Sequence, residues 1–578
     1  MYQKILDIKK IEKNLIINLN YFIIKQMQSQ LKTHLEESQF IIQSSKLYGG
    51  VNGFHDYGTL GFMVKQKLIN LWRKHFLFEE EIFEVETTTL TIPQILKASG
   101  HIDLFFDYVI YDKDNKCHRA DHLAKEYLKS KNENHEQVDT WSKQQLEYFI
   151  KNNLAQQLNL ELDQVILQTK NLMFKADDMY LRPETCQHLF GNFDQYLNFY
   201  KEKLPFGVAQ VGKSYRKEVS PKPFTRLLEF TQAEIEFFFD PLNNTYHKFD
   251  NVAHIKLPLL SSHDQIYNQS LQYVSVGDAV KNKIICNEIL VYFLARIYLF
   301  IQLIGLKEDK IRFRQHLPNE MAHYSADCWD LECLVDGNWL ECIGCADRQS
   351  YDLKAHSTIK PLTVKRDNKI IKIVPIMKEI GKIYKSKAKI LVDHLNGLDK
   401  SIVLNIQEHF CHSLEPLEIN INNELFFVSK EMIEYNYVFE EFYPHVIEPS
   451  FGIDRLIYAV LNQNFWTRNS DEQRIVLSLP IILTPYDVAI LQLSNDDKLL
   501  LVVSNIKKEL KNKGYLCYTD TSGVAIGKRY ARTDKLGIKY AITVDFDSLE
   551  DNKITIRERD SMNQIRVNVD DICNIIKN

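Results

Sequence analysis

Two segments far apart in the chain carry arginines and carboxylates that could together bind an anionic ligand. The first places Arg216 and Glu218 on a predicted strand, followed by a proline-containing turn and a second strand. The second runs through Gly452 to Arg455 at the start of a predicted helix. The planar, permanently charged guanidinium of arginine can clamp a phosphate together with a carboxylate. A lone arginine-x-glutamate pair on a strand is most often a surface ion pair, so the surrounding pattern decides its meaning.

That surrounding pattern is similar to a known family. Residues 214–218 with 226–230 resemble motif 2 of the class II aminoacyl-tRNA synthetases, and residues 448–455 resemble motif 3. The flanking sequence resembles the glycyl-tRNA synthetases of eukaryotes and archaea, over roughly residues 45–578. The resemblance implies a two-step reaction. Glycine would react with ATP to give glycyl-adenylate, and the glycyl group would pass to the 3′ end of tRNA(Gly).

The resemblance also implies which residues bind ATP. Arg216 and Arg455 are expected to be catalytic, gripping the triphosphate from opposite sides, and Phe230 is expected to stack on the base. The carboxylate of Glu341 is expected to hold Mg²⁺, which takes oxygen ligands and keeps several waters. Zinc is not expected, because the cysteines at 342 and 345 form a lone CxxC. The expected ATP-binding residues are Arg216, Lys217, Glu218, Arg226, Leu227, Phe230, Glu341, Cys342 and Arg455.

Glycine poses a recognition problem, because only its ammonium and its carboxylate can be gripped. Selectivity must therefore come from negative charge around the ammonium and from filled space where a Cβ would lie. Several anions sharing one site repel one another unless a cation binds, which favours the charged ligand. By resemblance, the glycine-binding residues are Glu184, Glu234, Glu448, Pro449 and Ser450.

Two neighbouring residues receive a plainer interpretation. Glu236 follows Glu234 at a spacing of two, so we expect it to belong to the polar face of an alternating strand. His101 stands in a family-like phrase after Gly100, and we expect a loop histidine whose hydrogen bonds are satisfied by the backbone.

The predicted fold class is α+β, with an antiparallel sheet flanked by helices and a C-terminal α/β anticodon-binding domain. A helix over about 61–78 followed by a strand over 82–87 resembles motif 1, which implies a homodimer interface. The predicted domains are a helical lead-in (1–45), a catalytic domain (46–475) with insertions at about 112–170 and 355–443, and an anticodon-binding domain (476–578).

The C-terminal region contains a basic segment with an aromatic residue, Tyr530, inside it. Lysines and arginines neutralise phosphates, and an aromatic ring can stack on an unpaired base. A run of such charges is most often a solvated helix face, but residues 557–564 also match the family. The expected tRNA contacts are Lys528, Arg529, Arg532 and Lys535.

Composition limits the remaining possibilities. A chain of 578 residues is too long for one core, and its net charge of −5 means that nucleic acid must bind through local patches. No apolar run approaches the length of a membrane span, so no membrane partner is expected. The ten scattered cysteines favour a reducing compartment. We expect a cytoplasmic protein, with an additional mitochondrial form left open.

The sequence departs from the family pattern at several positions. The motif 2 loop is one residue short around residues 221–224, Leu228 stands where a second arginine is common, and Asp454 replaces a glycine.

Two alternative functions are considered. One alternative is a synthetase-like accessory protein that binds nucleic acid without catalysis. The other is a ligase of the same fold for proline, threonine or serine, against which the carboxylate-rich segments argue.

Overall fold

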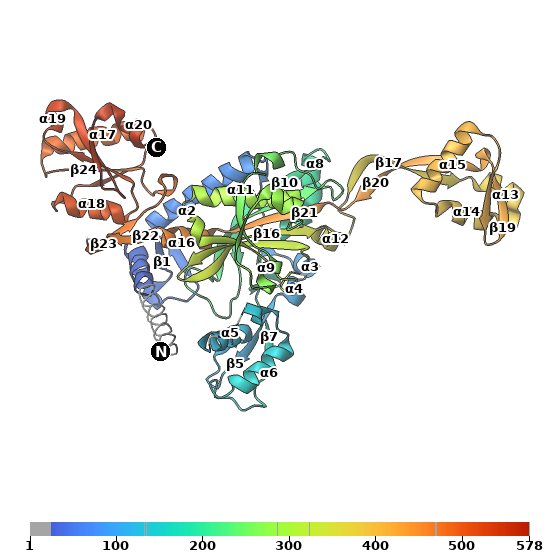
Figure 1. Cartoon of the computed structure of the whole chain (residues 1–578), viewed down its shortest axis with the longest axis horizontal. Helices are drawn as coiled ribbons and strands as arrows, with labels where there is room; N and C mark the ends of the chain where they lie inside the picture. The colour runs from blue at the N-terminus through green and yellow to red at the C-terminus, as the bar shows by residue number, and fades with distance from the viewer. Residues whose placement is uncertain are drawn as a thin grey trace, which may run out of the picture. The chain divides into compact units, whose positions relative to one another are not determined.

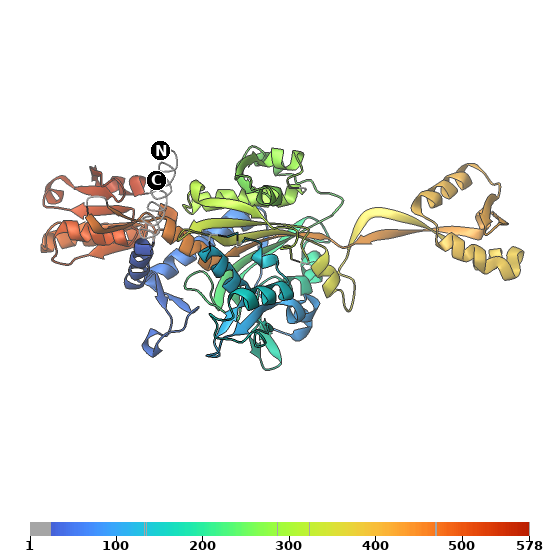
Figure 2. The ribbon, with the colours of Figure 1, turned by 60° about the horizontal axis from the view of Figure 1, so that its bottom comes forward.

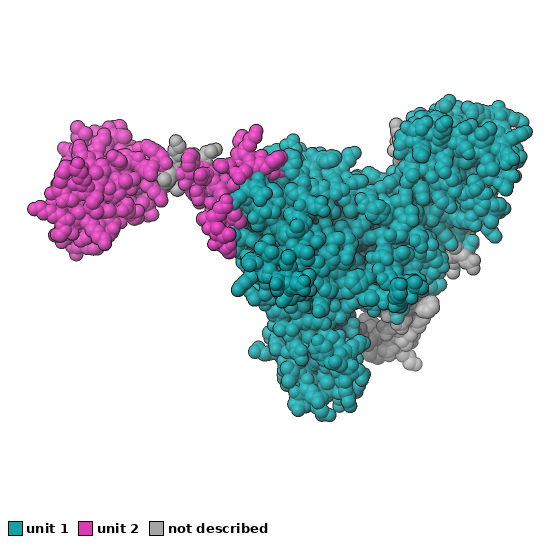
Figure 3. Space-filling view, turned by 180° about the vertical axis from the view of Figure 1, so that it is seen from behind, with its two compact units in different colours: residues 1–196, 204–356, 445–578 teal, residues 197–203, 357–444 magenta. Residues whose placement is uncertain are grey.

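The computed structural model describes residues 25–576 apart from 132, 135, 286, 323 and 469–470. The chain forms two compact units, coloured separately in Figure 3. The larger unit contains residues 1–196, 204–356 and 445–578, and the smaller contains residues 197–203 and 357–444.

The centre of the larger unit is a nine-stranded, mostly antiparallel sheet (Figure 1). Only the pairs β10 with β3 and β12 with β14 are parallel. In spatial order the strands are β13 (Gln272–Ser275), β12 (Lys256–Leu260), β14 (Ile311–Gln315), β15 (Asp327–Val335), β16 (Asn338–Gln349), β21 (His445–Gly452), β11 (Glu229–Phe239), β10 (Phe206–Tyr215) and β3 (Phe83–Glu84).

Three helices bury the sheet within one hydrophobic core. Helix α11 (Glu288–Leu303) is apolar around most of its circumference and contacts β16 and β21, as expected for a helix with no solvent face. Helix α16 (Ile453–Gln463) contacts β11, β15, β16 and α2 (Thr59–Trp72). The segments that resemble motifs 1, 2 and 3 therefore share one core.

The motif 1 region differs in detail from the prediction. Helix α2 ends at Trp72 and continues as a π-helical turn over Arg73–Phe78. The predicted strand over 82–87 shortens to β3 at the sheet edge, although the amide of Val85 still donates to the carbonyl of Ala209. The pairing stops there because the chain leaves the sheet.

Two further predictions need correction. Arg216 and Glu218 do not lie on a strand, because β10 ends at Tyr215 and only the Arg216 amide continues the pairing, to the carbonyl of Leu228. Within the predicted helical lead-in, residues 25–37 are helical, but β1 (Ile41–Gln43) pairs with β2 (His55–Tyr57). The periodic residues before 25 lie outside the described part of the chain.

The polar stretch after residue 105 folds around its own small core. Strands β5 (Phe106–Tyr111), β6 (Cys117–Arg119) and β7 (Gln168–Asn171) form a sheet, and α5 (Ala120–Ser130) packs on α6 (Lys143–Asn153). The smaller unit contains the two-stranded ribbon β17 (Val364–Pro375) and β20 (Ile433–Phe442). It also contains the hairpin β18–β19 (Leu417–Ile421, Glu424–Val428) and helices α13 (Met377–Tyr384), α14 (Ala388–Asn396) and α15 (Lys400–His412).

The C-terminal region is an α/β domain with a five-stranded sheet, seen from a second direction in Figure 2. Its three parallel strands β25, β24 and β26 continue into an antiparallel edge. The elements are β24 (Val488–Gln492), α17 (Asp497–Asn512), β25 (Cys517–Asp520), α18 (Ile526–Lys535), β26 (Tyr540–Val544), β27 (Lys553–Glu558) and β28 (Gln564–Asn568). No helix in the described ranges is long and apolar enough to cross a bilayer.

Candidate active site

One cavity of about 270 Å³ collects most of the residues predicted to carry the chemistry. Arg216, from the loop after β10, and Arg455, in the first turn of α16, both line it. Lys217 is exposed and Pro449 is buried within β21, and neither belongs to the lining. The other predicted residues that do line it are Glu184, Glu218, Arg226, Leu227, Phe230, Glu234, Glu341, Cys342, Glu448 and Ser450.

The Arg216 guanidinium is held in place without a carboxylate partner. Its Nε donates to the carbonyl of Pro183 at 3.1 Å, and its carbon lies 5.3 Å from the ring centroid of Phe105 and 5.5 Å from that of Phe230. No described carboxylate forms an ion pair with it. Its positive charge is therefore available to an anion in the cavity.

Arg455 is anchored mainly to backbone carbonyls. Its Nε donates to the carbonyl of Thr225 at 2.9 Å, and its Nη1 donates to the carbonyl of Glu341 at 2.8 Å. The Glu341 carboxylate lies 3.6 Å away. Arg455 thus connects α16, β16 and the motif 2 loop at one point.

Asp454 does not form an ion pair with its neighbour Arg455. Instead its Oδ1 accepts from Lys65 at 2.9 Å and from the Tyr57 hydroxyl at 2.6 Å. Its Oδ2 accepts from the amide of Thr231 at 2.5 Å. The substituted aspartate therefore links the motif 1 helix and the motif 2 strand directly behind the motif 3 arginine.

The shortened motif 2 loop is closed by aromatic stacking. Phe224 lies between His55, with centroids 4.8 Å apart and planes 4° apart, and Tyr458, at 4.6 Å and 11°. Its backbone φ is 64°, in the left-handed region that non-glycine residues rarely adopt. Further along the loop, Arg226 contacts His122 of α5 at 2.9 Å and Glu218 at 3.7 Å.

The Glu234 carboxylate is buried within a set of donors from neighbouring elements. It accepts from both the amide and the hydroxyl of Thr185, from Gln232 at 3.0 Å and from the Ser450 hydroxyl at 2.7 Å. Burial and the nearby charge of Glu184 raise the pKa of Glu234. The prediction that Glu234 and Ser450 lie together is consistent with their direct pairing across β11 and β21.

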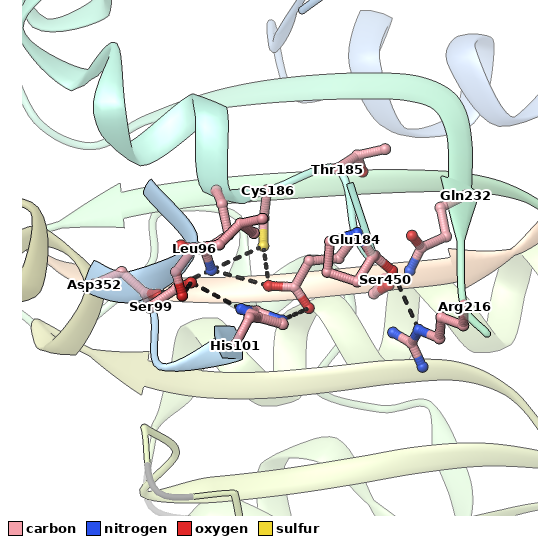
Figure 4. Close-up of polar contacts among 12 residues, drawn as sticks. Leu96, Ser99, His101, Glu184, Thr185, Cys186, Arg216, Gln232, Asp352 and Ser450 are labelled. Carbon is pink, nitrogen blue, oxygen red and sulfur yellow. Dashed lines mark hydrogen bonds and ion pairs between the residues drawn. The ribbon is translucent and has the colours of Figure 1, made fainter. Parts of the chain in front are cut away.

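Glu184 lies between sulfur, amide and imidazole donors (Figure 4). It accepts from Cys186 at 3.0 Å and from Gln187 at 2.9 Å, and His101 Nε2 lies 3.4 Å from its other oxygen. Burial opposes ionisation, but His101 and Arg348 hold the pKa of Glu184 well below its ordinary value. The expectation of a backbone-satisfied loop histidine was therefore wrong, because His101 contacts a pocket carboxylate and Ser99.

Arg348 is the main residue in contact with the cavity carboxylates that was not predicted. It is 1% exposed, donates to Glu448 at 2.6 Å and makes two hydrogen bonds to Asp352 at 2.7 and 2.9 Å. Its guanidinium also lies 3.8 Å from the ring centroid of Tyr324, another residue of the cavity wall. Arg348 lies on the same strand, β16, as Glu341. The sequence alone does not indicate that its side chain contacts Glu448.

A second residue that was not predicted, the carboxylate Asp330, lines the cavity with Glu341. Asp330 accepts from His316 Nε2 at 2.8 Å, and burial together with the charge of Glu341 raises its pKa to about 6. Desolvation opposes ionisation of Glu341, but the positive charges of Arg455, His316 and Arg216 lower its pKa. Two oxygen donors that repel each other at the cavity wall fit a hard divalent cation such as Mg²⁺.

The four basic residues predicted for tRNA all lie on α18, in the C-terminal domain, but they differ in exposure. Lys528 and Arg532 are exposed and Lys535 is half-buried. Arg529 is 3% exposed and donates to backbone carbonyls at 520 and 493, so its assignment to tRNA is corrected to a structural role. Tyr530 is also buried, with its hydroxyl at Thr543, and cannot stack on a base.

The comparisons with known proteins agree with this geometry. Residues 172–464 match the model of the tRNA synthetase class II core domain (G, H, P, S and T), and residues 487–578 match that of the anticodon binding domain. The glycine–tRNA ligase of Drosophila melanogaster is 36% identical, covering 98% of this chain and 79% of its own. That of Methanothrix thermoacetophila is 38% identical, covering 93% and 94%.

The chain belongs to the glycine–tRNA ligase family. Its fold is also similar to that of the prolyl-tRNA synthetase of Giardia lamblia solved in complex with prolyl-adenylate. That similarity has a TM-score of 0.52 at 12% identity, covering 95% of this chain and 76% of the other. The expected class II architecture is thereby confirmed for this member of the family.

The Lys65–Asp454 pair predicts an energetic coupling that can be measured. Removing either partner alone leaves the other charged side chain buried without its ion pair. Lys65→Met and Asp454→Gly should therefore each destabilise the catalytic core by about 3–5 kcal/mol. The double variant should lose clearly less than the sum. Calorimetric unfolding of the four proteins checks this.

The matched control is Lys46→Met, which breaks an ion pair with Glu36 whose lysine side chain is 72% exposed. It should change stability by less than about 1 kcal/mol. Strictly additive costs for Lys65→Met and Asp454→Gly would contradict the coupling.

Proposed function

We propose that the protein is a glycine–tRNA ligase that forms glycyl-adenylate from glycine and ATP and transfers glycine to the 3′ end of tRNA(Gly). The observation that carries the proposal is the shared cavity. Arg216 and Arg455, from segments more than two hundred residues apart, line it together with the buried carboxylates Glu184, Glu234 and Glu448. Positive charge for a triphosphate thus adjoins negative charge for an ammonium.

The first step is an in-line attack of the glycine carboxylate on the α-phosphorus of ATP. Two anions must meet, so the barrier is lowered by alignment and by fixed positive charge. Arg216 would bind the α-phosphate and the attacking carboxylate, and Arg455 would bind ATP from the side of α16. Glu218 would accept from the adenine amino group and Phe230 would stack on the base. The carboxylates of Glu341 and Asp330 would hold Mg²⁺, which neutralises charge on the phosphates.

The glycine ammonium would be surrounded by Glu184, Glu234 and Glu448. Ser450 and Tyr324 also line the cavity. In this pose their side chains would meet the side chain of a larger amino acid. A cation that binds among these carboxylates would reduce their mutual repulsion. The Cβ of a larger amino acid would instead have to fit against the cavity wall. This arrangement supports glycine over alanine or serine.

For the second step we propose that the C-terminal domain binds tRNA(Gly) through Lys528, Arg532 and Lys535. Lys528 and Arg532 are exposed on the same helix, α18, and exposure is required for contacts to phosphates. We further propose a homodimer formed through the motif 1 region. Phe62, Phe78 and Phe83 are 55%, 76% and 50% exposed there, and β3 is an edge strand of the nine-stranded sheet.

We assign the protein to the cytoplasm. The nine described cysteines have free thiols, and four of them are buried in the core of the larger unit. Free thiols of this kind are typical of a reducing compartment.

Pyrophosphate exchange tests the specificity directly. Exchange should depend on glycine, with alanine and serine at least about 100-fold less effective in kcat/KM, because the proposed subsite would have to accommodate an additional side chain against its wall. Equal exchange with alanine or serine would contradict glycine selection. No exchange with any amino acid would instead favour the non-catalytic accessory protein.

Arg216 should be required for chemistry and not for folding. Arg216→Ala should retain the wild-type unfolding temperature but lose about 100-fold or more in adenylate formation, because a preorganised charge at the reacting phosphate is removed. The same substitution at Arg312, which pairs with Glu332 on the neighbouring part of the sheet, serves as a control. Near-normal turnover of Arg216→Ala would show that its assigned role is wrong.

Two adjacent residues of α18 should separate tRNA binding from stability. Lys528→Ala should keep stability and weaken tRNA binding, with a salt dependence reduced by about one phosphate contact. Arg529→Ala should lower the unfolding temperature of the C-terminal domain, because it removes two buried hydrogen bonds to backbone carbonyls. Binding titrations at several salt concentrations, with thermal unfolding, distinguish them. Identical behaviour of the two variants would contradict the assignment.

A further inference from the structure

Glu236 is a buried carboxyl group with no described partner. It was predicted to face solvent on an alternating strand, but β11 is buried on both faces and Glu236 is 0% exposed. Neither of its oxygens accepts or donates a hydrogen bond among the described residues. A buried carboxyl group in this situation requires an explanation, since an unpartnered ionised group in the core is very costly.

The sheet register places this group opposite a substrate-facing carboxylate. Strands β11 and β21 pair Glu234 with Ser450 and Phe237 with Ile447, and the same register brings Glu236 opposite Glu448. The ladder between these pairs lacks a donor on β21, because residue 449 is proline. Single oxygens of Glu236 and Glu448 and the sulfur of Cys186 all lie within 4.8 Å of one another.

The surroundings contain more negative than positive groups. Among the residues that the structure describes, Arg348 is the one guanidinium in contact with Glu448, and it is shared with Asp352. Because Arg348 already occupies a Glu448 oxygen, the three grouped atoms are poorly arranged for a metal ion. The charged and titratable groups that face the pair from the packed elements are Glu184, Cys186, Glu234, Tyr324, Arg348 and Asp352.

We propose that the empty pocket holds one proton on the Glu236–Glu448 pair, and that the ammonium of glycine displaces this proton to solvent when it binds. The inference rests on the proposed function, because glycine is the ligand. Glu448 faces the ammonium directly, whereas Glu236 lies behind it and outside the cavity lining. Glu236 is therefore a positioning residue that acts through Glu448.

Electrostatics give the direction of the effect. Burial raises the pKa of Glu236 well above its ordinary value, and burial likewise raises that of Glu448. Two carboxylates this close cannot both ionise without a compensating cation. The ammonium supplies that cation, so both ionise in the complex and the pair stores the proton only when the pocket is empty.

The sign of the pH dependence follows from this difference. Because the free protein carries one more proton than the complex, glycine affinity should rise with pH, by up to tenfold per unit. The rise should extend from the ordinary carboxyl range up to the raised pKa of the empty pair, and affinity should level off above it. Glycine itself stays a zwitterion through this window, so its own ammonium does not supply the proton.

The test is calorimetric titration of the full-length protein with glycine, at one pH near neutrality, in buffers that differ in ionisation enthalpy. The wild type should release about one proton per glycine bound. Glu236→Gln keeps the shape but removes one of the two carboxyl groups that share the proton, so it should release clearly less than the wild type, with a glycine affinity that depends less on pH. Glu229→Gln, on the same strand but paired with exposed Lys213, should behave like the wild type.

The possible outcomes separate this inference from the proposed function. Glycine binding without proton release in the wild type, or equal release from Glu236→Gln, would overturn the proton-storing pair and leave the ligase intact. Absence of glycine binding by the wild type would overturn the proposed function itself. If Glu236→Gln does not fold, the pH dependence of glycine affinity in the wild type decides, and a flat profile overturns the inference.

Discussion

Repulsion among buried carboxylates is the constraint on which the rest of the site depends. Glu184, Glu234 and Glu448 come from three different parts of the chain, yet all line one cavity. Glu234 and Glu448 are buried, and the Glu184 side chain is 11% exposed. Such a cluster persists only if surrounding groups compensate it. His101 partly compensates Glu184, and Arg348 partly compensates Glu448. Under the proposed function, the ammonium of glycine would compensate the remaining negative charge, so that relief of the repulsion would contribute to the affinity for glycine.

The sheet makes this arrangement possible because its register fixes which side chains meet. The pairing of β11 with β21 aligns Glu234 with Ser450, and the pairing of β16 with β21 sets Gly344 beside Ser450. A glycine at that position leaves open space above the sheet, where a side chain would fill the cavity. The guanidinium groups approach from outside the sheet, on a loop and on a helix. Asp454 ties that helix to α2 through Lys65, so the side of the cavity that carries Arg455 is braced by the same core that supports motif 1.

Sequence reasoning identified elements that carry a local signature and missed contacts that depend on packing. The motif 2 and motif 3 segments were recognisable because arginine, proline and glycine stand at fixed spacings, and the two arginines do share a cavity. Period-two alternation suggested a solvated face for Glu236, but a central strand buried on both faces does not obey that rule. Arg529 and Arg348 show the converse limit. From sequence alone, a charged residue is interpreted as exposed to solvent or as binding a ligand. Only the folded structure shows that it has a buried partner.

The most direct test of the central claim measures, by calorimetry, the binding of non-hydrolysable glycyl-adenylate and alanyl-adenylate analogues. The wild type is compared with the Arg455→Ala and Glu184→Gln variants. If the arginines and the carboxylates of the cavity bind the same ligand, the wild type should bind the glycyl analogue at least about 100-fold more tightly than it binds the alanyl analogue. Each variant should lose more than about tenfold in affinity, which corresponds to about 1.4 kcal/mol. Equal affinity for the two analogues, or unchanged binding in both variants, would contradict a single site built from these residues.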